Sequence, residues 1–576
     1  MGNFIYVRGL TIPSILMNRP ACDQKLSGGN DSNNRWDPMN RIKPVSLLSQ
    51  SLSLSLSLSI VICTLLVTTA SAKTLRYASQ DDPQTLDPHS ANLVPTNRVL
   101  SQVYESLIMR DKNFKIVPAL AVSWSQPDPK TWRFKLRPNV KFHGGEAFTA
   151  DDVVFSVERA LNPLSQLKSA VQGVASAKKV DNLTVDFIMK EPNPVLLNHL
   201  FNFRVMSKEW AVKNKTELPQ NYKDREDTFA SRNTNGTGPF KVTLRQPDIK
   251  TVLVANADWW NKSSPEKGNI TQVDLLPVKS NATRAAALLS GEVDFVLDPP
   301  PQDIARLKEN PNVKVVEGHD ASVQYLAFDL SRSELLYSDV KGKNPFKDVR
   351  VRQAVAYAID INAIREKVMR NLSVPIGTMV TSDVRGYSKD ADKRLPFDRE
   401  KAKALLAEAG YPNGFSVTLD CGNVQPAADI CQAIPPMLSQ VGIRATPNIV
   451  PQTNYFPKIQ KFDTSMYLLR WGTPTFDSLY TLQALLHTNG GETSGLGDSN
   501  YGRYSNPKLD QLIAQIRSEG DLKKRDGLIR EALLINTNEL PIIPLHQQLV
   551  PWAMRKNVDA VFTPNNVAYF FRFKIN

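Results

Sequence analysis

The side chains that most often carry chemistry are few in this chain and stand far apart in its sequence. Zinc ligands on one helix recur at i and i+4, and no two histidines have that spacing. The chain also lacks a glycine-rich phosphate loop, a G-x-S-x-G turn, a C-x-x-C pair and a calcium loop. The sequence therefore predicts no catalytic residue, no metal site and no cofactor, and we expect a protein that is not an enzyme. The six histidines are His89, His143, His199, His319, His487 and His546.

Cysteine is the other residue type whose spacing is informative. Cys22 and Cys63 lie before residue 73, whereas Cys421 and Cys431 are ten residues apart in the remaining chain. In an oxidising compartment that spacing favours a disulfide, which would close a short loop and stabilise the fold by about 3 kcal/mol. Two free buried thiols are the alternative.

A segment near the N-terminus has the pattern of an export signal. The sequence SLSLSLSLSIVICTLLVTTASAKT (51–74) becomes continuously apolar from Ile60, follows the basic residues Arg41 and Lys43, and contains the small residues of a cleavage site near Ala72. Its strongly apolar part is about ten residues, shorter than the roughly 20 that span a bilayer. We expect residues 1–72 to be an N-terminal extension and secretory signal peptide. An uncleaved anchor and a core helix are the alternatives.

Composition limits the class of protein further. Removal of residues 1–72 leaves 504 residues, enough for two or three domains, with 64 basic against 54 acidic side chains and a net charge of +10. The basic side chains are spread out, and no run of five or more occurs. This pattern is typical of a solvated surface, and we expect no nucleic-acid partner.

Strands and helices are expected to alternate along the chain. TWRFKLR (131–137) alternates apolar and basic residues and predicts a strand with one buried face. Thr149, followed by Asp151 and Asp152, predicts a capped helix that buries Val154, Val157 and Leu161. Further helices are expected from about Asp348 through the sequence QAVAYAIDINAI, from Asp398, from Asn506–Pro507, and from Ile430 to Leu438, the last with a kink or early break at Pro435–Pro436.

Several motifs, taken in order, carry a resemblance to a known family. They begin with TLDPHSA (85–91) and VYESL (103–107), and the most specific is PALAVSWSQPDPKTWRFKLRPNVKFHGGEAFTADDVVFSVERAL (118–161). Together they resemble the extracellular solute-binding proteins of family 5, the periplasmic dipeptide- and oligopeptide-binding components of bacterial ABC importers. The remaining motifs are GTGPFKV (236–242), LLSGEVDFV (288–296), PFKDVRVRQAVAYAID (345–360), FDREKAKALLAEAGYPNGF (397–415), YSNPKLDQLI (504–513) and PLHQQ (544–548).

The resemblance implies an α/β fold, that of a two-lobed periplasmic binding protein (type II, cluster C-like) with a hinge between the lobes. We expect lobe I at 73–320, with an extra subdomain at about 115–235. Lobe II is expected at 325–535, and the chain is expected to return to lobe I over 536–576. Ligand sites favour domain interfaces, so the solute is expected in a cleft between the lobes.

The resemblance also implies where the solute is held. In peptide-binding members an aspartate three residues after a tryptophan holds the amino group of the peptide, and here Pro474 occupies that position after Trp471. Asp477 is expected either to replace that aspartate or to cap the helix that follows it. The ligand-binding residues expected are Trp471, Gly472, Thr473, Asp477, Tyr480, Ser90 and Gln547.

The expected function is capture of peptides or peptide-like solutes in the periplasm and their delivery to the permease and ATPase subunits of an ABC transporter in the inner membrane. The protein is expected to act as a monomer. The alternatives are a binding protein for an opine, an oligosaccharide or a metal chelate, a secreted peptidase, and a receptor or chaperone-like protein that uses the same fold without transport.

Overall fold

The structure, a computed structural model, describes residues 73–491 and 496–576, and the predicted signal peptide lies outside these residues. The described residues form one compact unit. The contacts between residues therefore do not divide this unit into two lobes, and the predicted lobe bounds stay a prediction.

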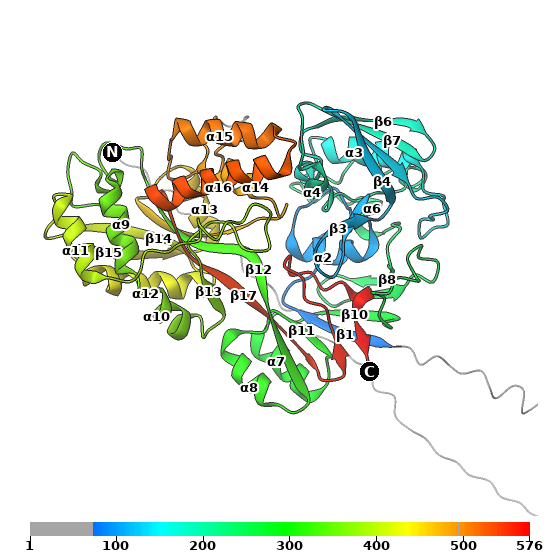
Figure 1. The fold of residues 1–576 in the computed structure, drawn as a ribbon. Helices are drawn as coiled ribbons and strands as arrows, with labels where there is room; N and C mark the ends of the chain where they lie inside the picture. The colour runs from blue at the N-terminus through cyan, green and yellow to red at the C-terminus, as the bar shows by residue number, and fades with distance from the viewer. Residues whose placement is uncertain (1–72, 492–495) are drawn as a thin grey trace, which may run out of the picture. The chain divides into compact units, whose positions relative to one another are not determined.

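A mixed sheet of eleven strands runs through this unit. Its two long central strands, β12 and β17, pair with each other, and the other strands extend the sheet to either side (Figure 1). In spatial order the strands are β15 (Ile443–Val450), β14 (Phe415–Gly422), β16 (Met466–Gly472), β12 (Val313–Phe328), β17 (Ile542–Arg555), β11 (Phe295–Leu297), β1 (Thr74–Ser79), β10 (Gln272–Pro277), β9 (Lys250–Ala255) and β8 (Phe240–Gln246), with β13 (Ser373–Pro375) paired to β17.

The central strands connect two halves of the sheet. The C-terminal part of β12 pairs with β16, and the C-terminal part of β17 pairs with β11. Between these parts the pairing of β12 with β17 is interrupted, with a register shift between His319 and Val323. We call the side with β11, β1, β10, β9 and β8 the β1 half, and the side with β16, β14 and β15 the β14 half.

Helices cover both halves (Figure 1). In the β1 half these are α2 (Val94–Val103), α5 (Lys208–Lys213), α6 (Phe229–Arg232), α7 (Asn281–Ser290) and α8 (Ile304–Glu309), while α3 (Ala150–Leu161) and α4 (Leu196–Leu200) pack against a separate four-stranded sheet. In the β14 half they are α9 (Val349–Ala358), α10 (Ile361–Ala363), α11 (Arg399–Glu408), α12 (Ala427–Ser439), α13 (Gln452–Gln460), α14 (Ser478–Thr481), α15 (Pro507–Ser518) and α16 (Leu522–Glu539).

The predicted strand at 131–137 lies in a separate four-stranded sheet. There β5 (Thr131–Leu136) buries Trp132, Phe134 and Leu136, as the alternation predicts. The sheet order is β4 (Ala121–Asp128), β5, β7 (Thr184–Met189) and β6 (Val174–Asp181). Two small sheets pair β2 (Ile108–Arg110) with β3 (Ile116–Pro118), and β18 (Val558–Asp559) with β19 (Lys574–Ile575).

Helix α3 begins where Thr149 predicts it. The Thr149 and Asp152 side chains form a reciprocal capping box that satisfies backbone N–H groups of the first turn. The buried face of the helix differs from the predicted one, because Val153 and Phe155 are buried with Val157, while Val154 and Leu161 are half-buried.

Two other helices differ from the predictions. The helix from Asp348 ends at Ala358, because the Asp360 side chain accepts the backbone N–H of Ala363 and starts a new turn. Helix α12 does not break early and continues through Pro435 and Pro436 to Ser439. Its apolar face, with Ile430, Ile434 and Leu438, is fully buried in the core of the β14 half, and this packing offsets the hydrogen bonds that the prolines cannot make.

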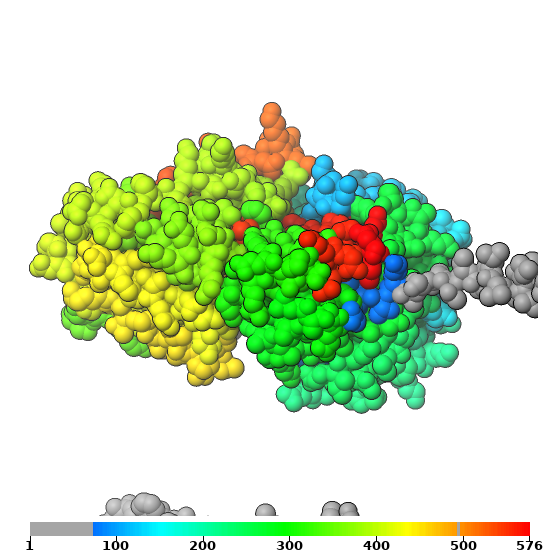
Figure 2. All heavy atoms as spheres, turned by 90° about the horizontal axis from the view of Figure 1, so that it is seen from below, coloured from blue at the N-terminus to red at the C-terminus, as the bar shows by residue number. Residues whose placement is uncertain are grey.

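The C-terminal segment returns to the β1 half. Phe570, Phe571 and Phe573 pack in the same core as Phe295 of β11 and Trp552 of β17. Figure 2 shows this segment against the residues near position 300 and beside the first strand. The two halves are thus built from segments far apart in the sequence.

Candidate functional site

The loop after β16 holds most of the residues expected to bind a solute. Trp471 is half-buried and stacks on Tyr480, with ring centroids 5.3 Å apart and an interplanar angle of 23°. The Trp471 indole N–H donates to the Thr481 hydroxyl at 3.1 Å, which fixes the ring. Gly472 is exposed beside it, whereas Thr473 is buried and shares a hydrogen bond with Thr481. Trp471, Gly472 and Tyr480 therefore lie together, with Thr473 beneath them.

The end of β16 leaves part of its backbone open. On one side β16 pairs with β12 along its whole length. On the other side β14 pairs only with Met466–Leu468. In the part of the chain that the structure describes, no strand pairs with Leu469–Gly472 on that side. Main-chain groups beside Trp471 are thus placed to pair with an extended ligand.

Asp477 occupies a different position from the one expected of an ammonium ligand. Its carboxylate is 1% exposed and makes a bidentate ion pair with Arg525, with hydrogen bonds of 2.7 and 2.8 Å. It also accepts the backbone N–H of Leu479 at 2.9 Å, as the cap of α14. Of the two alternatives for Asp477, the structure shows the helix cap. The carboxylate is already neutralised, so a solute ammonium would have to displace Arg525.

Gln547 lies on β17, next to the interruption in its pairing with β12. Its side-chain amide donates to the Asp320 carbonyl at 3.0 Å and approaches Asp383 at 3.5 Å. Its carbonyl contacts the His319 ring at 3.3 Å. Asp320 in turn makes an ion pair with Arg470, the residue before Trp471.

Three charged residues near Gln547, which are Asp320, Asp383 and Arg470, were not expected from the sequence. Burial raises the pKa of the Asp320 carboxyl group, and Arg470 partly offsets this effect. Arg470 offered a signal, because it is a charged residue at the end of the apolar run MYLL (466–469). Asp320 and Asp383 offered none, because their proximity depends on how distant segments pack.

Ser90 does not lie with the other expected residues. It is fully buried, and its hydroxyl donates to Gln220 at 3.0 Å. The same region holds the buried ion pair of Asp87 with Arg159, 2.6 Å apart. Ser90 thus belongs to a buried polar network that ties the segment after β1 to the neighbouring elements.

The two cysteines of the described chain form a disulfide in the structure. Cys421 lies on β14 and Cys431 on α12, and both are fully buried, with Cα atoms 6.4 Å apart. The bond joins a strand of the β14 half to the helix that covers it.

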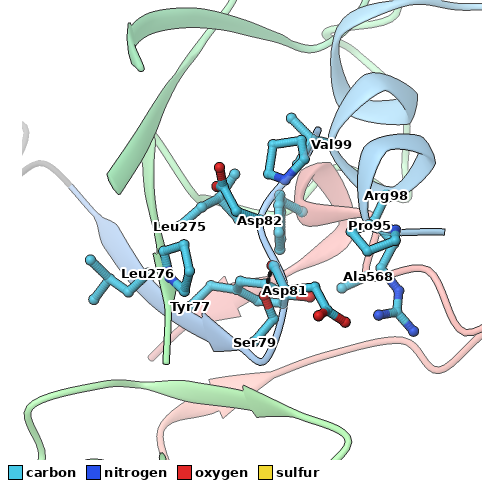
Figure 3. Close-up of a pocket in the computed structure, with 13 residues that line it drawn as sticks. Tyr77, Ser79, Asp81, Asp82, Pro95, Arg98, Val99, Leu275, Leu276 and Ala568 are labelled. Carbon is cyan, nitrogen blue, oxygen red and sulfur yellow. Dashed lines mark hydrogen bonds between the residues drawn. The ribbon is translucent and has the colours of Figure 1, made fainter. Parts of the chain in front are cut away.

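Two hollows lie in the β1 half. One is at the C-terminal ends of the parallel strands β1 and β10, the edge of a sheet where ligands commonly bind. Figure 3 shows Tyr77 of β1 and Leu275 of β10 lining it on the strand side, with Pro95, Arg98 and Val99 of α2 on the other side. Its volume is only about 20 Å³, room for about one water molecule. A larger cavity of about 110 Å³ lies between α2, β2, residues 201–204 and residues 565–572.

Clusters of metal ligands and membrane-spanning helices are absent from residues 73–491 and 496–576. No group of three or more histidine, cysteine, aspartate or glutamate side chains there is arranged to hold a metal ion. Over the same residues, no helix has both the length and the apolar character needed to cross a bilayer.

Comparison with known proteins gives consistent matches along the chain. Residues 115–493 match the model of the bacterial extracellular solute-binding proteins, family 5 Middle. Heme-binding protein A of Haemophilus influenzae is 29% identical over 479 residues, which cover 78% of this chain and 82% of that protein. The dipeptide-binding protein of Escherichia coli strain K12 is 28% identical over 531 residues, 86% of this chain and 94% of that protein.

The fold has close structural counterparts as well. The periplasmic binding protein DppA of Helicobacter pylori, solved in complex with the peptide STSA, superposes with a TM-score of 0.69 at 23% identity and covers 87% of this chain and 98% of its own. This likeness confirms the predicted fold class, a mixed α/β periplasmic binding protein fold.

Proposed function

Because the chain belongs to family 5 of the bacterial extracellular solute-binding proteins, we propose that it captures a small peptide or peptide-like solute in the periplasm and delivers it to an ABC importer. Proteins of this family bind small solutes for ABC transporters and are not enzymes. The finer statements, that the solute is peptide-like and that the partners are a permease and an ATPase in the inner membrane, are our proposal.

The observation that carries the peptide proposal is the open edge of β16. Four consecutive residues, Leu469–Gly472, have no strand partner on the β14 side within the described chain. An extended peptide can add to such an edge through main-chain hydrogen bonds, which do not depend on side-chain identity. The stacked rings of Trp471 and Tyr480 stand beside this edge and offer a flat apolar wall.

A different carboxylate is available for the amino group of such a solute. Pro474 carries no charge, and Asp477 is paired with Arg525. Asp383 is exposed, and the contact that the structure gives its carboxylate is a hydrogen bond from Gln547 at 3.5 Å. We propose Asp383 as the group that holds a solute ammonium, in place of Asp477.

A second candidate is a non-peptide solute. One relative with 29% identity is named for heme binding, and a metal chelate, an opine or an oligosaccharide would fit the same family. The open strand edge favours a ligand with a peptide backbone, and none of these alternatives has one.

Native mass spectrometry of the protein purified from the periplasm tests the proposal. We expect the protein to carry short peptides, and Trp471→Ala to lose them. Trp124→Ala, in the separate sheet with β5, is the matched control and should keep them. Asp383→Asn should lower the occupancy by peptides with a free amino terminus. Recovery of heme, an opine or a sugar instead would overturn the peptide assignment.

Export is proposed from the sequence of residues 1–72 alone. The intact mass of the periplasmic protein should correspond to a chain that begins at Lys73 if cleavage follows Ala72. A mass that retains the leader would refute the cleavage site.

A further inference from the structure

We infer that the larger cavity of the β1 half binds a carboxylate group, held by the guanidinium groups of Arg204 and Arg110. The inference rests on the proposed function in one respect, that the carboxylate belongs to a captured solute. It does not require that solute to be a peptide.

The cavity is large enough for such a group. Its volume is about 110 Å³, somewhat smaller than the roughly 150 Å³ cavity that accepts a benzene molecule. Several of its lining side chains are only half-buried, among them Asn97, Asn565 and Tyr569, so it is not sealed within the core. A carboxylate with a short aliphatic stem fits this space.

Arg204 is a buried cation that lacks an anionic partner within the described chain. It is 7% exposed and lines the cavity. Its side chain donates one hydrogen bond that the structure records, from Nη2 to the Asn97 carbonyl at a long 3.5 Å, and Nη1 is buried with no partner. No carboxylate of the described chain pairs with it. Burial lowers its pKa to about 10, which reflects the cost of a desolvated and unpaired charge.

The other buried arginines show how unusual this is. Three are neutralised by a carboxylate, and two others donate to main-chain carbonyl groups at 2.6 to 3.2 Å. The first three are Arg159 with Asp87, Arg525 with Asp477 and Arg572 with Glu266, and the other two are Arg284 and Arg352. Arg204 has neither arrangement, so no group of the described chain neutralises its guanidinium or accepts short hydrogen bonds from it.

Arg110 supplies a second cation to the same cavity. It is 8% exposed, donates to the main-chain carbonyls of Phe114 and Thr475 at 2.9 and 3.4 Å, and has a buried Nε without a partner. Its guanidinium lies over the rings of Phe114, Phe201 and Phe476, at 4.8 to 5.1 Å from their centroids. Within the described residues it makes no ion pair. The rings hold its orientation but do not neutralise it.

The one acidic side chain that lines the cavity is already engaged. The Glu105 carboxylate accepts hydrogen bonds from the indole N–H groups of Trp259 and Trp260, at 3.0 and 2.8 Å, and from the Thr237 hydroxyl at 2.8 Å. The arginine whose charge acts on it is Arg137. Glu105 therefore leaves Arg204 and Arg110 without an anion.

Neutral groups of the cavity are unpaired too. The side-chain oxygens of Asn97 and Asn565 are buried without a partner. Native structures leave few buried polar atoms unpaired, and four such atoms, from Asn97, Arg110, Arg204 and Asn565, line this single cavity. Two of the four are acceptor oxygens. The other two, Nε of Arg110 and Nη1 of Arg204, are N–H donors of charged guanidinium groups, and such groups bind the two oxygens of a carboxylate.

The test uses sodium propionate, with its neutral isostere propionamide and with sodium chloride at equal ionic strength as controls. Propionate should raise the thermal unfolding midpoint of the exported protein by about 1–2 °C beyond chloride at saturation, and propionamide should not. Arg204→Gln should abolish the propionate effect. Its own midpoint, without ligand, should equal or exceed that of the wild type, because an unpaired buried charge has been removed.

Arg284→Gln is the matched control, because Arg284 is also buried but donates to carbonyl groups away from the cavity. It should lower the midpoint and keep the propionate effect. If Arg204→Gln does not fold, Arg204→Lys is the second variant, because it keeps the charge but loses the forked guanidinium group. The propionate concentration that gives half of the shift in unfolding midpoint should then rise at least tenfold. Equal effects of propionate and chloride on the wild type, or a propionate effect that survives in Arg204→Gln, would overturn the inference.

The outcomes separate this inference from the proposed function. A propionate effect that depends on Arg204, with no peptide in the purified protein, would refute the peptide assignment alone. Peptides in the purified protein, with no specific propionate effect, would refute the carboxylate site alone.

Discussion

Replacement of Asp477 by alanine should destabilise the β14 half, and it should not act on the solute directly. Asp477 and Arg525 are 1% and 0% exposed and are joined by two hydrogen bonds of 2.7 and 2.8 Å. The Arg525 guanidinium otherwise donates to the Ile516 carbonyl at 3.1 Å. Asp477→Ala therefore leaves a buried guanidinium without its anion.

The expected cost has two parts. Breaking a buried ion pair by removal of one partner costs about 3–5 kcal/mol. Loss of the cap on Leu479 adds about 1 kcal/mol. Asp477→Asn retains a capping oxygen and should recover that second part only. The double variant Asp477→Ala with Arg525→Met should recover most of the first, because no unpaired charge remains.

Urea unfolding of the exported protein at pH 7, followed by circular dichroism, measures these differences. Midpoints are compared, because a chain of this size need not unfold in two states. The order expected, from most to least stable, is wild type, then Asp477→Asn or the double variant, then Asp477→Ala. The reasoning is refuted if Asp477→Ala has the midpoint of the wild type but binds its solute at least tenfold more weakly. That result would mean that the carboxylate faces the solute.

Three further predictions follow from the described contacts. Burial lowers the pKa of His89 to about 3 and that of His546 to about 4. Only the unfolded chain then takes up these protons below pH 6.5, so their contribution to the free energy of unfolding falls between pH 6.5 and 4. The fall in the urea midpoint over this range should be shallower in His546→Gln, and an unchanged slope would contradict the prediction. Reduction of the bond between Cys421 and Cys431 should lower the free energy of unfolding by about 2–3 kcal/mol, measured with and without reductant, and an equal midpoint would contradict it. Gly472→Ala should leave the unfolding midpoint unchanged, because the added methyl group has only the Ser322 Cβ, at 4.0 Å, nearby. It should weaken solute binding in calorimetry, and wild-type affinity would show that the edge of β16 is not used.

Local structure could be predicted well where short-range patterns decide it. The alternation of TWRFKLR placed β5 on a buried face, and Thr149 marked the start of α3, because both signals act within a few residues. A kink or an early break was expected at Pro435–Pro436, and the early break was wrong because the burial of Ile430, Ile434 and Leu438 depends on the whole β14 half. Propensity is a weak prior when such packing opposes it.

The candidate site was less predictable, for the same physical reason. Trp471 and Tyr480 lie within one short segment of the sequence and are found stacked, whereas Asp477 pairs with Arg525, 48 residues further along the chain. Whether the charged groups of Arg204 and Asp383 have a partner also depends on segments that are distant in the sequence. FNFRVM (201–206) did offer one signal for Arg204, a basic residue inside an apolar stretch, but it could not show that no carboxylate would reach it.

The central claim is that this protein binds a solute and leaves it chemically unchanged. Titration calorimetry tests it most directly, with the solute released from the purified protein and added back to protein freed of it. We expect a saturable heat with one site per chain, a Kd of micromolar or tighter, about 8 kcal/mol, and a return to the baseline after each injection. A steady heat that persists after each injection would reveal turnover and contradict the account, as would heats that never saturate.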